Sequence, residues 1–140
     1  MNWLYFMLIT SFCMTSSLQA AALNTSYSQI KKILLNMNSS GKRVELKVGT
    51  EIQIELQGIG ATGYSWYVDQ LDLDLLELIG EERREIKKEP NDLTGNTLLF
   101  FWKLKTKKPG TSMIRLDYYR IWEGKDKATQ RFEVSVNIHP

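Results

Sequence analysis

The sequence is poor in the residue types that most catalytic and metal sites require. Its 140 residues include one cysteine, Cys13, and one histidine, His139, which is next to the last residue. Zinc sites, and nucleophiles that work with a histidine, therefore cannot be assembled from this chain alone. We interpret His139 as an exposed, frayed end of the chain rather than as a catalytic base or a metal ligand.

Charge of one sign and phosphate-binding loops are also lacking. The 18 basic and 16 acidic residues leave a net charge of +2, which does not indicate a nucleic-acid partner. Gly58, Gly60 and Gly63 do not lead into the Lys-Ser/Thr of a phosphate loop. The acids mostly occupy alternating positions of strand-like segments, which does not favour a glycosidase with paired carboxylates. We therefore expect no enzyme and no metal or cofactor.

The N-terminus has the layout of a secretory signal peptide, which we assign to residues 1–22. Residues 3–14 are almost wholly apolar and uncharged, and small residues follow them. The run is too short to span a bilayer, which needs about 20 apolar residues. It also has no preceding Lys or Arg, so an uncleaved anchor remains an alternative. Cleavage would remove the only cysteine and give a secreted or periplasmic chain without a membrane segment.

Residues 23–41 read as a polar N-terminal lead-in to a domain at 42–140. The few apolar residues of the lead-in are Ile30, Ile33, Leu34 and Met37. Their spacing is helical, so this segment is predicted to be either a short amphipathic turn or flexible chain.

From residue 43 the apolar pattern changes to a period of two, which is typical of half-buried strands. Seven strands are predicted, at 44–48, 52–56, 64–68, 71–79, 98–104, 111–118 and 132–138. The first two are expected to form a hairpin around Gly49-Thr50, and the charged run 81–89 is expected to form a solvated edge. This pattern predicts an all-β fold, a seven-stranded immunoglobulin-like antiparallel β-sandwich.

Strand parity predicts a composite binding surface at one end of this sandwich. In an antiparallel order, the connections at 58–63, 90–96 and 120–127 share one end, and the shorter connections share the other. The first of these connections contains three glycines, which allow positive φ angles and close approach. Loops of this kind on a rigid frame are suited to binding.

Large side chains near these loops have different expected roles. Trp66 and Trp102 fall within strands and are predicted to lie in the core. Trp122 lies outside the alternating part of its strand, so both a core and an interface role remain open. Arg120 is expected either to anchor its own loop through carbonyl groups or to reach a partner.

Three short motifs occur in an order that resembles a known inhibitor family. They are Thr62-Gly63-Tyr64-Ser65-Trp66, Thr94-Gly95-Asn96-Thr97 and Tyr118-Tyr119-Arg120-Ile121-Trp122. Their order and spacing are similar to the three loop motifs of the chagasin-like inhibitors of papain-family cysteine peptidases. The first loop keeps only the last Thr and Gly of the family's Asn-Pro-Thr-Thr-Gly, and Ile121 replaces the proline of Arg-Pro-Trp.

The resemblance implies a monomeric, reversible, non-covalent inhibitor that presses three loops into the cleft of a papain-family peptidase. The first loop would cover the catalytic cysteine, the third would set Trp122 against the enzyme wall, and the middle loop would clamp the far side. The residues implied to contact the peptidase are Gly60, Ala61, Thr62, Gly63, Tyr64, Thr94, Gly95, Asn96, Thr97, Arg120 and Trp122. The alternative is a secreted immunoglobulin-like recognition or adhesion module that binds another protein or a glycan.

Overall fold

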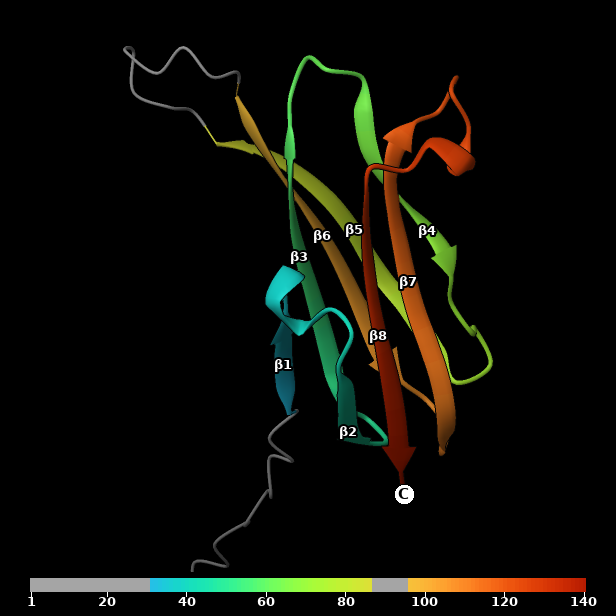
Figure 1. Cartoon of the computed structure of the whole chain (residues 1–140). Coiled ribbons are helices and arrows are strands. Elements are labelled where there is room, and N and C mark those ends of the chain that lie inside the picture. The colour runs from blue at the N-terminus through green and yellow to red at the C-terminus, as the bar shows by residue number, and fades with distance from the viewer. Residues whose placement is uncertain (1–30, 87–95) are drawn as a thin grey trace, which may run out of the picture.

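The chain folds into two β-sheets that pack face to face (Figure 1). The computed structural model describes residues 31–86 and 96–140. The elements within these ranges are β1 (Lys32–Leu35), η1 (Met37–Ser39), β2 (Arg43–Lys47), β3 (Glu51–Ile59), β4 (Tyr64–Gln70), β5 (Leu76–Ile86), β6 (Thr97–Thr106), β7 (Gly110–Arg120), η2 (Lys125–Lys127) and β8 (Gln130–His139). None of the described helices is long and apolar enough to cross a membrane.

Each sheet has four strands, in the orders β1-β3-β6-β5 and β2-β8-β7-β4. The predicted all-β sandwich is confirmed, but the described residues contain eight strands rather than seven. Two of the pairings, β1 with β3 and β2 with β8, are parallel, so the sheets are mixed and not purely antiparallel.

The core lies between the sheets and is filled by the inward-facing residues of each strand. Along β3 and β8 every second side chain is buried, as the period of two predicts. Trp66 and Trp102 are buried in this core, which confirms their predicted role. The indole Nε1 of Trp66 also donates a hydrogen bond of 2.9 Å to the carbonyl oxygen of Gln57.

The strand β1 replaces the helical turn or flexible lead-in expected for this part of the chain. Ile33 and Leu34 lie in β1, and Met37 lies in the short helix η1. Ile30 lies outside the described residues. The prediction from helical spacing was wrong because β1 is short and pairs with β3, which is remote in sequence. Tertiary pairing therefore decides the conformation of this segment.

The predicted hairpin around Gly49 and Thr50 is wrong, because β2 and β3 belong to different sheets. Thr50 is buried, and its N–H donates to the side-chain oxygen of Thr106 at 2.9 Å. That same hydroxyl donates to the carbonyl oxygen of Lys47 at 2.7 Å. Thr106 thus holds a crossover between the sheets, which strand alternation alone cannot distinguish from a hairpin.

The strand predicted at 71–79 begins later, at Leu76. The side chain of Asp72 accepts hydrogen bonds from the N–H groups of Asp74 and Leu75, which makes a turn of the preceding residues. From Leu76 the strand continues into the charged run up to Ile86, and β5 is an edge strand, as predicted. Residues 87–89 of that run lie outside the described residues.

Candidate functional site: two loops joined at one end of the sandwich

Two of the three predicted loops lie at the same end of the sandwich, opposite the C-terminus (Figure 1). They are the connection from β3 to β4, residues 60–63, which we call the first loop, and the connection from β7 to β8, residues 121–129, which we call the third loop. Thr94 and Gly95 of the predicted middle loop lie outside the described residues.

The first loop is a tight turn with two residues at positive φ. Gly63 has φ +77°, and Ala61, with φ +64°, is the only non-glycine residue of the described part of the chain in this region. The hydroxyl of Thr62 donates to the carbonyl oxygen of Ile59 at 2.9 Å and closes the turn on itself. Alanine in this conformation costs about 1 kcal/mol, so the surrounding contacts hold the turn in place.

Tyr118 supports the first loop from below and was not among the residues predicted for the site. Its hydroxyl accepts a hydrogen bond of 3.0 Å from the N–H of Ile59. The centroid of its buried ring lies 5.3 Å from the ring centroid of Tyr64 and 5.1 Å from that of Trp66. Gly58 leaves room for this packing, because a Cβ atom there would lie 3.0 Å from the Tyr118 hydroxyl.

The third loop is closed by backbone hydrogen bonds at both of its ends. The N–H of Glu123 donates to the carbonyl oxygen of Arg120, and the N–H of Thr129 donates to that of Tyr118, each at 2.9 Å. The helix η2 forms a single turn between them. Tyr118 therefore holds the first loop through its hydroxyl and the third loop through its carbonyl group.

Arg120 joins the two loops directly. Its Nε donates to the carbonyl oxygen of Thr62 at 2.9 Å, and its Nη1 lies 3.1 Å from a carboxylate oxygen of Glu123. The guanidinium group also lies over the ring of Tyr64, at 4.5 Å from its centroid. Of the two roles expected for Arg120, the structure thus shows an anchor, which holds the neighbouring loop as well as its own.

Trp122 rests on the first loop and leaves much of its indole free. It is 68% exposed, yet a Cβ atom on Gly63 would lie only 2.1 Å from its Cη2 atom. The ring therefore packs on the bare backbone of Gly63. Of the two roles left open for Trp122, a core position is excluded, and an exposed aromatic surface remains.

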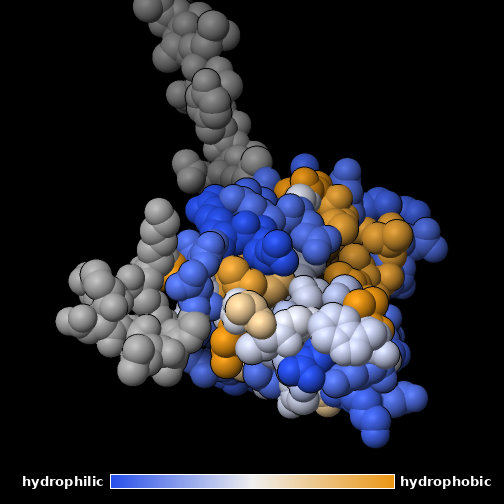
Figure 2. Space-filling view, turned by 90° about the horizontal axis from the view of Figure 1, so that it is seen from above, coloured by the Kyte–Doolittle hydropathy of each residue, from blue (hydrophilic) through white to orange (hydrophobic). Residues whose placement is uncertain are grey.

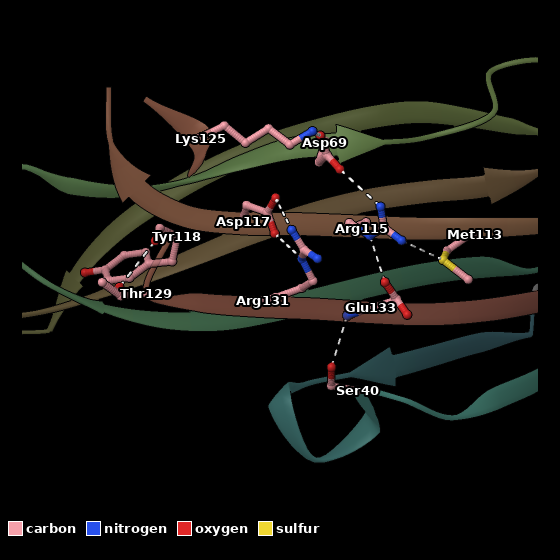
Figure 3. Close-up of polar contacts among 10 residues, drawn as sticks. All are labelled: Ser40, Asp69, Met113, Arg115, Asp117, Tyr118, Lys125, Thr129, Arg131 and Glu133. Atoms are coloured by element: carbon pink, nitrogen blue, oxygen red, sulfur yellow. Dashed lines mark hydrogen bonds and ion pairs between the residues drawn. The ribbon is translucent and has the colours of Figure 1, made fainter. Parts of the chain in front are cut away.

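The third loop is also fixed to the outer face of the β2-β8-β7-β4 sheet (Figure 3). Lys125 of η2 forms an ion pair with Asp69 of β4, and Asp69 also lies 3.5 Å from Arg115. The hydrogen bond from Lys125 holds the pKa of Asp69 below its ordinary value, although partial burial opposes this shift. The charged form of Asp69 is thus the form that fixes the loop.

A second ion pair on this face lies beside the base of the third loop. Asp117 is fully buried and accepts two hydrogen bonds from Arg131, at 2.7 and 3.1 Å. Since Asp117 precedes Tyr118 in β7, the same strand segment carries the ion pair on one face and the loop support on the other.

The described end of the middle loop reaches the first loop. The carbonyl oxygen of Asn96 accepts a hydrogen bond of 2.8 Å from the N–H of Gly60. The side-chain amide of Asn96 contacts the carboxylate of Glu85. Thr97 begins β6 and is paired with Ile59. All of the described residues predicted for the site therefore lie at one end of the molecule.

The surface at this end has an exposed apolar part of the kind that suits protein contact. Figure 2 looks onto it and shows hydrophobic and neutral residues across its middle, with hydrophilic residues around them.

Among the described residues, no group of three or more His, Cys, Asp or Glu side chains could hold a metal ion. His139 is exposed but ordered in β8, where it pairs with Lys47 and its Nε2 lies 2.5 Å from Glu45.

Comparison with sequence families gives one match to most of the sandwich. Residues 45–136 match the sequence profile of the chagasin family peptidase inhibitor I42. The matched span contains all three predicted loops. No curated protein sequence gives a significant match to the chain.

Solved structures with a similar fold include two proteins matched over nearly their whole length. The cysteine protease inhibitor EhICP2 from Entamoeba histolytica is 23% identical with a TM-score of 0.70, over 79% of this chain and 98% of that chain. Amebosin is 22% identical with a TM-score of 0.56, over 78% of this chain and 98% of that chain. At these identities the likeness shows a shared fold.

A third structure, PbICP-C in complex with falcipain-2, is 21% identical, over 78% of this chain and 99% of that chain. Its TM-score is 0.49.

Proposed function

The chain belongs to the chagasin family of peptidase inhibitors, and from this premise we propose that it inhibits papain-like cysteine peptidases reversibly, with the loop end of the sandwich. The observation that carries the proposal is the contact between Trp122 and Gly63. It presents an exposed aromatic ring and a narrow glycine turn as one surface. A narrow turn fits a cleft, and an aromatic ring fits the apolar ledge beside it.

The first loop can enter a peptidase cleft without acting as a substrate. Proteolysis needs an accessible carbonyl group, whose oxygen moves into an oxyanion hole as the nucleophile attacks. The carbonyl oxygen of Thr62 is already bonded to Arg120, and Gly63 has φ +77° rather than an extended conformation. A catalytic cysteine that faces the Thr62–Gly63 bond would therefore meet a peptide group held in the wrong geometry.

The third loop supplies the apolar anchor. Trp122 is already ordered by Gly63, so little side-chain freedom is lost when a partner covers it. Tryptophan is among the residues that most often dominate binding energy at the centre of an interface. In the proposed complex it lies against the wall of the cleft beside the catalytic histidine of the enzyme.

The remaining contacts belong to the ends of the first and middle loops. Asn96 and Thr97, together with Thr94 and Gly95, are proposed to clamp the far side of the cleft. The hydrogen bond between Gly60 and Asn96 supports this arrangement, because it ties the described end of the middle loop to the first loop. We propose that the inhibitor acts as a monomer and is secreted or periplasmic after removal of residues 1–22.

Protection of the peptidase cysteine tests the proposed mode of binding. A papain-like peptidase is saturated with the mature chain and treated with iodoacetamide, and the complex is then dissociated by dilution. The proposal predicts that peptidase activity returns and that the inhibitor is recovered uncleaved between Thr62 and Gly63. Alkylation at the rate of the free enzyme would show that the loop end does not cover the cysteine.

A further inference from the structure

The outer face of the β1-β3-β6-β5 sheet changes from charged to apolar toward the loop end. Strand register places five rows of residues from β3, β6 and β5 across it. The rows are Glu51–Lys105–Glu77, Gln53–Lys103–Gly80, Glu55–Phe101–Glu82, Gln57–Leu99–Arg84 and Ile59–Thr97–Ile86. The first two rows carry no large apolar side chain, whereas the last three carry four.

The apolar residues of the last two rows remain accessible. Ile59 is 56% exposed, Ile86 is 42% exposed, and Leu99 between their strands is half-buried. A solvated face would continue the alternation of polar side chains that the far half of the sheet has.

The Glu55–Phe101–Glu82 row, one step farther from the loop end, differs because its apolar side chain is covered. Phe101 is covered by the guanidinium of Arg84, which lies 5.2 Å from the ring centroid. Arg84 is fixed there by two hydrogen bonds to Glu82, of 2.6 and 3.0 Å. The Arg84–Glu82 pair thus covers the ring of Phe101, whereas Ile59 and Ile86, nearer the loops, keep 56% and 42% of their surface exposed.

This apolar area is continuous with the proposed peptidase-binding loops. Ile59 directly precedes the first loop, and its carbonyl oxygen accepts the hydrogen bond from Thr62 that closes that loop. Thr97, in the same row, directly follows Asn96, which is bonded to Gly60. A partner seated on the loop end would therefore lie next to the Ile59–Thr97–Ile86 row.

We propose that Ile59, Leu99 and Ile86 form a second contact surface for the peptidase, outside the catalytic cleft. This inference rests on the proposed function. The partner surface is an apolar patch of the peptidase beside the cleft, because the Ile59–Thr97–Ile86 row, which lies next to the loops, carries no charged group. Such a contact adds affinity through burial of apolar area, and it acts on the dissociation rate more than on the association rate.

A pair of isoleucines on the same strand provides the test. Ile86→Ser removes the proposed contact, and Ile79→Ser is the matched control, since Ile79 is 45% exposed in β5 but far from the loop end. Inhibition of a papain-like peptidase, dissociation rate and thermal unfolding are measured for both. We expect Ile86→Ser to raise the inhibition constant about fivefold through faster dissociation, with Ile79→Ser unchanged.

The double variant Ile59→Ser/Ile86→Ser is expected to weaken inhibition further, by about tenfold or more relative to the unmodified chain. A third variant, Trp122→Ala, removes the exposed ring of the third loop and reports on the proposed function itself. If Ile86→Ser and Ile79→Ser have equal inhibition constants while Trp122→Ala inhibits less tightly, the second contact surface is overturned. The proposed function then still stands. A dimer in sedimentation that Ile86→Ser abolishes would also overturn it, because a second copy would then cover the patch. Absence of any inhibition by the unmodified chain would reject the proposed function itself.

Discussion

The Nε atom of Arg120 donates a hydrogen bond of 2.9 Å to the carbonyl oxygen of Thr62, across 58 residues of sequence. This bond joins the last residue of β7 to the first loop, and the guanidinium group lies over the ring of Tyr64 at the same time. The two loops are therefore held together by a side chain that faces both of them. Preorganisation of this kind lowers the entropy lost on binding.

Arg120→Lys is expected to weaken peptidase inhibition about tenfold, because an ammonium group cannot donate from the Nε position and stack in the same plane. Glu123→Gln is the matched control. It keeps Arg120 and removes only the charge of its exposed partner, so inhibition should change by less than about threefold. Inhibition constants of both variants check this, and equal losses would show that Glu123 rather than Thr62 orients Arg120.

Gly63→Ala is expected to weaken inhibition about tenfold or more, because the added methyl group would collide with Trp122. Gly49→Ala separates this effect from backbone strain. Gly49 has φ +85° at the far end of the molecule, and a Cβ atom there meets nothing within 4 Å. Both variants should lose about 1 kcal/mol of unfolding free energy, but only Gly63→Ala should lose affinity. Retained affinity in Gly63→Ala would contradict the proposed role of this contact.

Trp122→Ala is expected to raise the inhibition constant at least about tenfold, which corresponds to about 1.4 kcal/mol. Because the side chain is 68% exposed, the unfolding free energy should change by less than about 0.5 kcal/mol. Enzyme inhibition and urea unfolding measure the two quantities separately. An unchanged inhibition constant would mean that Trp122 only covers Gly63.

The ion pair between Lys125 and Asp69 makes the folding stability depend on pH, and the direction of this dependence follows from the pKa of Asp69. The folded-state pKa of Asp69 is lowered from its ordinary value of 3.8, chiefly by the hydrogen bond from Lys125. Its contribution to stability is therefore complete above that value, and is lost as pH falls through the lower folded-state pKa. Urea unfolding between pH 6 and about pH 2 should show a smaller loss of stability for Lys125→Ala than for the unmodified chain. Identical curves would contradict the assignment of Lys125 as the main cause.

Much of the frame could be predicted from the sequence, because a buried strand face imposes a period of two. The alternation along β3 and β8 identified both strands and their buried residues. Alternation does not specify a partner strand, however. The crossover at Gly49 and Thr50 depends on buried hydrogen bonds to Thr106, 56 residues away, which no local pattern reveals.

The site could be predicted in part for the same reason. Gly63, Arg120 and Trp122 belong to recognisable motifs, and strand parity places their loops at one end. Tyr118 was missed because its role comes from the register of β4 and β7, which sets it opposite Trp66 and below Ile59. Its place within the third motif was the signal available, but a tyrosine in a buried strand first suggests packing.

The central claim is that the loop end binds and blocks a papain-like cysteine peptidase. The most direct measurement is a titration of active peptidase with the mature chain, with residual activity followed on a small substrate. The account predicts a stoichiometric loss of activity at one inhibitor per enzyme, which is recovered on dilution. Full activity at micromolar concentrations of correctly folded inhibitor would contradict it.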